Sequence, residues 1–366
     1  MSLVQIFTPL ALGKVTLRNR IVMSPMTRSR ATAEGVPTPL MAEYYAQRAA
    51  AGLIVTEGTA PSPNGKGYAR IPGLWNAEQV AAWKIVTDAV HAKGGVIFAQ
   101  IMHTGRIGHA ANLVQGGQVL APSAVQAAGQ IWTDTQSMQD FPTPRAMTDT
   151  EVRVAIAEFV EAAKHAIAAG FDGVELHGAN GYLIEQFLNP HSNVRTDVWG
   201  GSVEKRITFA VEVAKAVAVV IGGERVGIRL SPHGAASDMK PFDEVEQTYV
   251  ALLAKLAPLG LAYVHVVDHS SLGSPAVPQS TKDAIRKHWP RTLILAGGFD
   301  GASAEAALLA KAGDLIGFAR SFIGNPDLVE RLQHGAALAT PDFATFYTPG
   351  AKGYTDYPVA EHAATN

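Results

Sequence analysis

Three hydrogen-bonding side chains, His177, Asn180 and Tyr182, lie close together in the stretch GVELHGANGYLIEQFLNP, residues 173–190. Apolar residues of strand character precede them, and an apolar segment typical of a helix follows. All three side chains can donate hydrogen bonds, and the tyrosine hydroxyl can also transfer a proton. A core histidine and a packed tyrosine are the ordinary interpretation of each residue alone. Because the three meet where a strand becomes a helix, we interpret the stretch as part of an active site.

The elements that position these residues repeat along nearly the whole chain. Short β-rich runs predict eight strands: Ile21–Ser24, Leu53–Thr56, Val96–Gln100, Gly173–Leu176, Val226–Leu230, Tyr263–Val267, Leu293–Ala296 and Asp314–Phe318. Longer periodic patterns between them predict helices: Leu40–Ala51, Glu78–Lys93, Glu151–Ala169, Val203–Val220, Asp243–Leu259, Thr281–His288 and Ala302–Lys311. Thr148 and Glu151 match a capping box at the start of the third helix, and Gly170 is a stop signal after it.

Eight strands, each followed by a crossover, predict a single α/β domain over residues 1–366. Parallel strands need crossover connections and are covered on both faces, and eight of them close into a (β/α)8 TIM barrel. An open doubly wound sheet is the alternative, but no glycine fingerprint follows the first strand. The segment between Gln100 and Thr148 is a long excursion after strand 3. Loops of that length are usually functional, so we expect a capping subdomain over about residues 104–147 at the barrel mouth.

Polar or glycine-rich tips follow seven of the predicted strands. In barrels of this type the active site lies at the carboxyl ends of the strands. A single residue such as Gln100 could be a satisfied buried polar group, whereas seven such tips together indicate a site. The tips read SPMTR, TEGTAPSP, QIMHTGR, HGANGY, RLSP, AGGF and GFARSF.

The seventh and eighth strand ends have the composition of a phosphate site. Gly297 and Gly298 stand before a predicted helix, and Gly317 and Arg320 follow in the next unit. Backbone amides at a helix start, together with an arginine, bind phosphate in these two loops of many barrels. The alternative is that the glycines serve tight turns and that Arg320 forms a surface ion pair. The position in the barrel favours a phosphorylated cofactor.

Composition narrows the chemistry further. The chain of 366 residues contains no cysteine, which excludes disulfides, thiolate nucleophiles and cysteine-ligated clusters. His103, His109 and His191 do not have metal-site spacing, so no metal is predicted. A net charge of −2 without a run of Lys or Arg argues against nucleic acid or a lipid surface as a partner. The lack of a leader pattern or of a long apolar stretch predicts a soluble cytoplasmic protein.

Two phosphorylated cofactors suit a cysteine-free barrel. Pyridoxal phosphate needs a Schiff-base lysine, and no predicted strand end offers one. Flavin mononucleotide (FMN) needs hydrogen-bonding partners, and Gln100, Arg229 and Thr27 are suitable in type. Arg229 would be a costly unpaired charge inside an apolar barrel unless an anionic ligand or a carboxylate met it.

Motifs spread over almost the entire chain resemble one family. They include FTPLALGKVTLRNRIVMSPMTRSRA, VTEGTAPSPNGKGYARIPGLW, AQIMHTGRIGH, GFDGVELHGANGYLIEQFLNPHSNVRTDVWGGSVEKR, VGIRLSP, DLIGFARSFIGNPDL and GYTDYP. Together they resemble the Old Yellow Enzyme family of FMN-dependent ene-reductases, in the branch that includes N-ethylmaleimide reductases. The stretch from HGANGYLIEQFL to WGGS carries the most specific part of this resemblance.

The resemblance implies a role for each candidate residue. His177 and Asn180 would bind the carbonyl or nitro oxygen of the substrate, and Tyr182 would donate a proton. Residues implied to contact FMN are Pro25, Met26, Thr27, Ala60, Gln100 and Arg229 at the ring, and Gly298, Gly317, Ala319 and Arg320 at the phosphate. Residues implied to form the walls of the substrate pocket are Tyr68, Met102 and Tyr347.

The implied activity is reduction of the activated C=C bond of α,β-unsaturated carbonyl, maleimide or nitro compounds. FMN would take hydride from NADPH or NADH and pass it to the β-carbon, and Tyr182 would protonate the α-carbon. The implied partners are small electrophilic alkenes, with the protein a monomer or homodimer. A general NADPH:acceptor or nitro-ester reductase, or a flavoprotein without catalysis, remains an alternative. A barrel hydrolase or aldolase would need paired carboxylates or a lysine at strand ends, and Glu175, the acid within a predicted strand, has no evident partner in the sequence.

Overall fold

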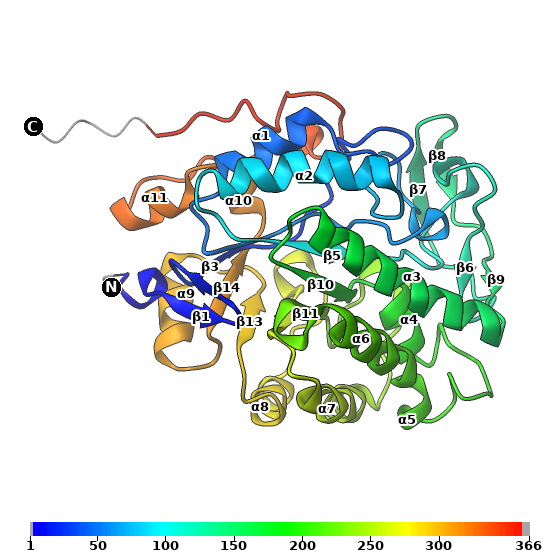
Figure 1. The fold of residues 1–366 in the computed structure, drawn as a ribbon. Coiled ribbons are helices and arrows are strands. Elements are labelled where there is room, and N and C mark those ends of the chain that lie inside the picture. Colours follow the sequence, from blue (N-terminus) through cyan, green and yellow to red (C-terminus); the bar gives the residue numbers. More distant parts are fainter. Residues whose placement is uncertain (1–2, 361–366) are drawn as a thin grey trace, which may run out of the picture.

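Eight parallel strands close into a barrel in the computed structural model, which describes residues 3–360 (Figure 1). Each strand pairs in parallel with the barrel strands before and after it in the chain, and the last pairs with the first. In this order the strands are β3 (Ile21–Met23), β4 (Leu53–Val55), β5 (Ile97–Ile101), β10 (Gly173–Gly178), β11 (Val226–Leu230), β12 (Tyr263–Val267), β13 (Leu293–Ala296) and β14 (Leu315–Phe318). The predicted TIM barrel and its eight strands are confirmed.

The fourth barrel strand differs from the prediction in a way that matters for the site. β10 continues to Gly178 rather than ending at Leu176, so His177 lies within the strand. Its backbone pairs in register with Arg229 of β11. Side chains two residues apart on a strand share a face, and Glu175 contacts His265 of the non-adjacent β12, so His177 and Glu175 point into the barrel.

Helices cover the outside of the barrel (Figure 1). They are α1 (Pro39–Gln47), α2 (Ala77–His91), α3 (Asp149–Ala168), α4 (Leu183–Leu188), α5 (Val203–Arg206), α6 (Thr208–Ile221), α7 (Val245–Leu256), α8 (Gln279–His288), α9 (Gly301–Leu309), α10 (Arg320–Gly324) and α11 (Leu328–His334). The prediction of one helix over Val203–Val220 is wrong, because the chain forms α5 and α6 around Ile207. Ile207 keeps helical dihedral angles, so apolar residues recur at helical spacing across the junction. The sequence pattern therefore does not indicate where α5 ends and α6 begins.

An amino-terminal hairpin closes the bottom of the barrel. Its strands are β1 (Leu10–Leu12) and β2 (Val15–Leu17), which pair antiparallel. The last residue of each strand is buried with Phe98 of β5 and Tyr263 of β12 in an apolar cluster inside the barrel. Because this end is filled with apolar side chains, the opposite, carboxyl end is where a polar site can form.

The long excursion between β5 and α3 contains two small sheets. β7 (Gln130–Thr133) and β8 (Ser137–Asp140) form an antiparallel hairpin. β6 (Leu120–Ala121) and β9 (Arg145–Ala146) pair in parallel below it. Figure 1 shows all four strands gathered at one side of the barrel. The role of this long excursion as a capping subdomain stays a prediction.

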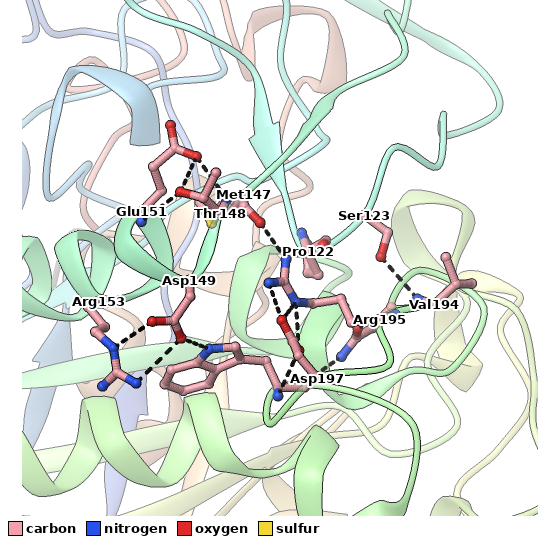
Figure 2. Close-up of polar contacts among 12 residues, drawn as sticks. Pro122, Ser123, Met147, Thr148, Asp149, Glu151, Arg153, Val194, Arg195 and Asp197 are labelled. Atoms are coloured by element: carbon pink, nitrogen blue, oxygen red, sulfur yellow. Dashed lines mark hydrogen bonds and ion pairs between the residues drawn. The ribbon is translucent and has the colours of Figure 1, made fainter.

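Arg195, in the loop between α4 and α5, joins two segments of the excursion (Figure 2). Its Nη1 donates to the carbonyl oxygens of Pro122, at 3.0 Å, and of Met147, and its guanidinium pairs with Asp197. Met147 immediately precedes the predicted capping box at the start of α3, which is present: Thr148 Oγ1 accepts the Glu151 N–H at 3.2 Å. The stretch NVRTDVWGG, residues 193–201, therefore helps to position the excursion.

Two buried arginines fix the chain that follows α11. Arg28 donates from Nη2 to the carbonyl oxygen of Gly353 at 2.7 Å and from Nε to that of Phe346 at 3.1 Å. Arg30 donates from Nη1 to the same Phe346 oxygen at 2.6 Å. Charged donors make strong hydrogen bonds to buried carbonyls. These contacts hold Tyr347, the next residue, at the rim of the barrel mouth.

Candidate active site

His177 is a neutral hydrogen-bond donor at the barrel mouth. Its side chain is buried, and burial together with the nearby positive charge of Arg229 holds the pKa of the imidazole well below its ordinary value. The backbone N–H of Ala179 donates to His177 Nδ1 at 3.3 Å. The single ring proton therefore sits on Nε2, which is left to donate to a ligand.

Asn180 lies in a strained turn that is held from two sides. Its φ of 60° is in the left-handed region, which asparagine tolerates better than most residues. Its N–H donates to Ser231 Oγ at 2.9 Å, beyond the end of β11. On the other side, His269 Nε2 lies 2.6 Å from Asn180 Oδ1, across the loop that follows β12. The structure thus brings three strand ends together around one amide side chain.

Tyr182 packs against both His177 and Tyr68. The ring centroids of His177 and Tyr182 are 4.8 Å apart in an edge-on arrangement. The Tyr182 and Tyr68 hydroxyl groups are hydrogen-bonded at 3.2 Å. Burial raises the pKa of Tyr182 above its ordinary value, although the hydrogen bond with Tyr68 and the charge of Arg229 oppose this. Tyr182 therefore carries its proton at neutral pH and can donate it.

The turn at residues 180–181 rests on the buried carboxyl group of Glu185 in α4. Glu185 Oε2 accepts the N–H of Gly181 at 2.6 Å, and Oε1 accepts the hydroxyl of Ser231 at 2.8 Å and that of Tyr249 at 2.9 Å. Ser231 in turn accepts the N–H of Asn180. Burial raises the pKa of Glu185 to about 7, although these hydrogen bonds oppose the shift.

The raised pKa makes a testable contribution to stability. The Glu185 carboxyl group ionises near its ordinary pKa of 4.5 in the unfolded protein and near a pKa of 7 in the folded protein. Its favourable contribution to the free energy of unfolding is therefore complete below pH 4.5 and is lost as the pH rises through 7. Relative to Glu185→Gln, the unfolding free energy of the wild type should fall by about 3 kcal/mol over this interval. Urea unfolding of both proteins at several pH values measures the difference. A constant difference would contradict the assigned pKa.

A cavity of about 770 Å³ opens in front of these residues. Four candidate residues, Thr27, Tyr68, Tyr182 and Tyr347, line it. The β7–β8 hairpin supplies another wall, through residues such as Trp132 and Met138. Arg70 joins that wall to the carboxyl-terminal segment, because it pairs with Asp134 and donates to the carbonyl oxygen of Tyr347 at 3.0 Å. The volume is that of a site for a small organic molecule.

Glu175 has partners that the sequence did not reveal. Gln100 Nε2 donates to Oε1 at 2.8 Å, and His265 Nδ1 lies 2.8 Å from Oε2. Burial alone would raise the pKa of Glu175, but His265 and Arg229 together hold it below its ordinary value. Glu175 is therefore an ionised member of a polar layer inside the barrel. These partners are not a second carboxylate, so the layer lacks the acid pair that a barrel glycosidase uses.

Comparison with known proteins identifies the family. A model of the NADH:flavin oxidoreductase / NADH oxidase family matches residues 5–339, most of the chain. The chain belongs to this family. A chanoclavine-I aldehyde reductase of Penicillium roqueforti (strain FM164) is 45% identical over 363 residues, covering 96% of each protein. A probable flavin mononucleotide-dependent alkene reductase of Leishmania infantum is 41% identical over 354 residues, also covering 96% of each.

A solved structure shows the same fold and a nicotinamide ligand. Morphinone reductase in complex with tetrahydroNAD superposes with a TM-score of 0.93 at 42% identity, covering 99% of each chain. An Old Yellow Enzyme homologue from Zymomonas mobilis is also similar, with a TM-score of 0.92 at 40% identity, covering 97% of this chain and 100% of that chain. The resemblance to the Old Yellow Enzyme family is thereby confirmed, and this flavin oxidoreductase is an FMN-dependent enzyme that takes hydride from NAD(P)H.

The barrel mouth of this flavin oxidoreductase offers polar atoms that fit a flavin. Arg229 Nε, His265 Nε2 and Ser24 Oγ are three of the buried side-chain atoms that have no hydrogen-bond partner among the described residues. Buried polar atoms are almost always paired, so polar atoms left open together inside the barrel indicate a ligand. Arg229 would meet carbonyl oxygens of the flavin pyrimidine edge. Gln100, fixed by Glu175, stands two strands away and keeps its amide oxygen for the same edge.

The other residues assigned to the flavin ring lie around the same end of the barrel, next to residues assigned to the substrate pocket. Pro25 and Met26 directly follow β3, and Thr27 lines the cavity. Ala60 and Met102 are buried in one apolar cluster, against which Tyr68 and Tyr182 pack. Their positions suit an apolar ring that is covered on one side and open to the cavity on the other.

The glycines assigned to the phosphate have structural reasons of their own. Gly298 has a φ of 71°, which favours glycine. A Cβ at Gly317 would lie 2.4 Å from Ser24 Oγ. Ala319 is half-buried. Arg320 begins α10 and is exposed, and its guanidinium lies 6.0 Å from the centre of the Phe343 ring. The phosphate site therefore stays a prediction that rests on the strand ends and the resemblance.

Four residues that support the site were missed in the sequence: Ser231, Glu185, His265 and His269. The sixth strand end, Asp268-His269, carries polar residues like the others, and a complete inventory of strand ends would have included it. Glu185 reads as an ordinary helix residue in the sequence. In the described part of the chain, no group of three or more His, Asp or Glu side chains could hold a metal ion. No helix of residues 3–360 has the length and apolarity to cross a membrane.

Proposed function

We propose that this flavin oxidoreductase is an ene-reductase for activated alkenes. Its substrates are α,β-unsaturated carbonyl compounds, maleimides and nitroalkenes, small molecules that the cavity of about 770 Å³ accommodates. The observation that carries the proposal is the cluster of His177, Asn180 and Tyr182: two hydrogen-bond donors next to a protonated phenol at the edge of the cavity. The monomeric or homodimeric state and the cytoplasmic location stay predictions.

FMN supplies the redox chemistry, because it accepts hydride from NAD(P)H and can return it to a substrate carbon. His177 Nε2 and the amide of Asn180 bind the carbonyl or nitro oxygen of the alkene. Both donors are neutral, so they stabilise the negative charge that develops on that oxygen without forming an ion pair with the substrate beforehand. Removing one such donor typically costs about 100-fold in rate.

Tyr182 supplies the proton for the α-carbon. Its hydroxyl keeps its proton because burial disfavours the phenolate. Tyr68, hydrogen-bonded to it at 3.2 Å, is itself buried, and burial holds its pKa well above the ordinary value. A pair of protonated phenols at this place supports carbon protonation, which a simple NADPH:acceptor reductase does not need.

Carbonyl reduction is the competing activity, since a similar protein is named an aldehyde reductase. An unsaturated aldehyde such as cinnamaldehyde distinguishes the two activities, because it offers a C=C bond and a C=O bond together. We expect the saturated aldehyde as the product with NADPH as donor, identified by gas chromatography. The unsaturated alcohol as the main product would contradict the proposal.

A further inference from the structure

His269 lies at the sixth strand end, in the loop that begins after β12. Its Nε2 lies 2.6 Å from Asn180 Oδ1, although 89 residues separate the two in the chain. The side chain is half-buried beside the barrel mouth. A short hydrogen bond between two loops from different strands constrains the amide that faces the substrate.

The loop that carries His269 is itself well anchored. The N–H of Asp268 donates to the carbonyl oxygen of Ala296 in β13 at 2.8 Å. The Asp268 carboxylate accepts the N–H of Ser270 at 3.0 Å and pairs with Lys282 at 2.9 Å. The imidazole is thus presented from an ordered support rather than from a free loop.

The amide oxygen that faces His269 Nε2 at 2.6 Å determines which ring nitrogen of the neutral imidazole carries the proton. Burial lowers the pKa of His269 to about 4, and the charge of Arg229 acts in the same direction, while Asp268 opposes it. The ring is neutral at pH 7 and carries one proton. Because Nε2 faces an amide oxygen, that proton lies on Nε2 and is donated to Asn180 Oδ1.

Asn180 has one remaining freedom that this hydrogen bond removes. Its backbone is fixed by the N–H bond to Ser231 and by a φ of 60°. The side-chain amide could still rotate by half a turn and exchange its oxygen with its NH2 group. With the oxygen bound to His269, the NH2 group is left to donate, and no residue among 3–360 accepts a hydrogen bond from it.

We propose that His269 is a positioning residue that fixes the Asn180 amide so that its NH2 group donates to the activating oxygen of the substrate. This rests on the ene-reductase function proposed above. It also deepens that function, since an amide held in this orientation selects alkenes activated by an acceptor oxygen, such as enones and nitroalkenes. An activating group that can only donate hydrogen bonds would meet a second donor and be rejected.

Two isosteric variants test the proposal. In His269→Gln, the side-chain NH2 group can still donate to Asn180 Oδ1. In His269→Glu, the ionised carboxylate only accepts, so the Asn180 amide turns its NH2 group toward it and presents oxygen to the substrate. His269→Ala releases the amide without reversing it. All three are studied as holoenzymes with FMN bound.

Two readouts apply to each variant. The first is the dissociation constant of cyclohexanone, an unreactive ketone, from the change in the visible spectrum of the oxidised enzyme. The second is the rate at which dithionite-reduced enzyme is reoxidised by 2-cyclohexenone. We expect His269→Gln to stay within about threefold of wild type, His269→Ala to lose a few-fold, and His269→Glu to lose about 100-fold, the cost of one lost donor.

The same variants in an Asn180→Ala background separate positioning from other effects. If His269 acts through Asn180, the His269→Gln and His269→Glu variants should have the same ketone dissociation constant and the same reoxidation rate in this background. A direct effect of the introduced charge on the flavin would instead keep the two variants different. Equal losses for Gln and Glu in the parent protein, or an undiminished difference in the Asn180→Ala background, would overturn the proposal. If the wild type itself neither binds the ketone nor is reoxidised by the enone, the ene-reductase function fails instead.

Discussion

Replacing Tyr182 by phenylalanine is expected to slow reoxidation of the reduced enzyme by 2-cyclohexenone by 100-fold or more, with little effect on reduction by NADPH. A positioned general acid typically contributes about 10²–10⁴-fold. The substitution keeps the ring that packs against His177 and Tyr68 and removes only the hydroxyl at the cavity edge. Because hydride transfer from the nicotinamide needs no proton from the protein, the reductive half-reaction keeps its rate. Anaerobic stopped-flow absorbance measures each half-reaction separately.

Tyr347→Phe is the matched control for Tyr182→Phe. Tyr347 also lines the cavity, but its side chain is 55% exposed at the rim. Its hydroxyl should be dispensable, and both half-reactions should stay close to wild type. Equal losses in the two half-reactions of Tyr182→Phe would show that the tyrosine orders the cavity and does not donate the proton.

Replacing Arg229 by methionine is expected to weaken FMN binding by 10- to 100-fold. Hydrogen bonds to charged groups contribute about 1.5–3 kcal/mol, which corresponds to such a factor. Arg229 is buried, and its Nε is unpaired among the described residues. Once the arginine is removed, water does not replace the hydrogen bonds that it can make to the flavin, because the position is buried. The variant also deprives the ionised Glu175 of a nearby positive charge. Fluorescence titration of the apoprotein with FMN gives the dissociation constant.

Arg225→Met serves as the control for Arg229→Met. Arg225 immediately precedes β11, so the strand separates it from the carboxyl tip where Arg229 lies. Its loss should leave the FMN dissociation constant within about twofold of wild type, because no ligand group meets that end. An unchanged constant in Arg229→Met, with the protein still folded by circular dichroism, would remove Arg229 from the flavin site.

Local sequence patterns were sufficient to predict the barrel. Buried parallel strands are continuous apolar runs, and periodic helices alternate with them, so both signals lie within short windows. The Thr148–Glu151 capping box is a further local signal, and it is present. In a closed parallel barrel the carboxyl ends of all strands lie at the same end. The order of strands in the sequence is therefore enough to place His177, Gln100 and Arg229 at that end.

The support of the site depends on contacts between distant residues and was therefore missed. Glu175 meets His265 across 90 residues, and His269 meets Asn180 across 89. No spacing rule links such pairs, because the closed barrel alone brings their strands together. The same holds for Glu185, whose carboxyl group reads as an exposed helix residue until α4 is seen to bury it under the turn.

The central claim is that bound FMN passes hydride from NAD(P)H to an activated alkene in this site. Purified protein is titrated anaerobically with NADPH, and 2-cyclohexenone is then added without oxygen. We predict that the visible flavin absorption is bleached by NADPH and restored by the enone, with cyclohexanone formed in an amount equal to the flavin reoxidised. A flavin that NADPH reduces but the enone leaves bleached, while oxygen restores it, would contradict the account.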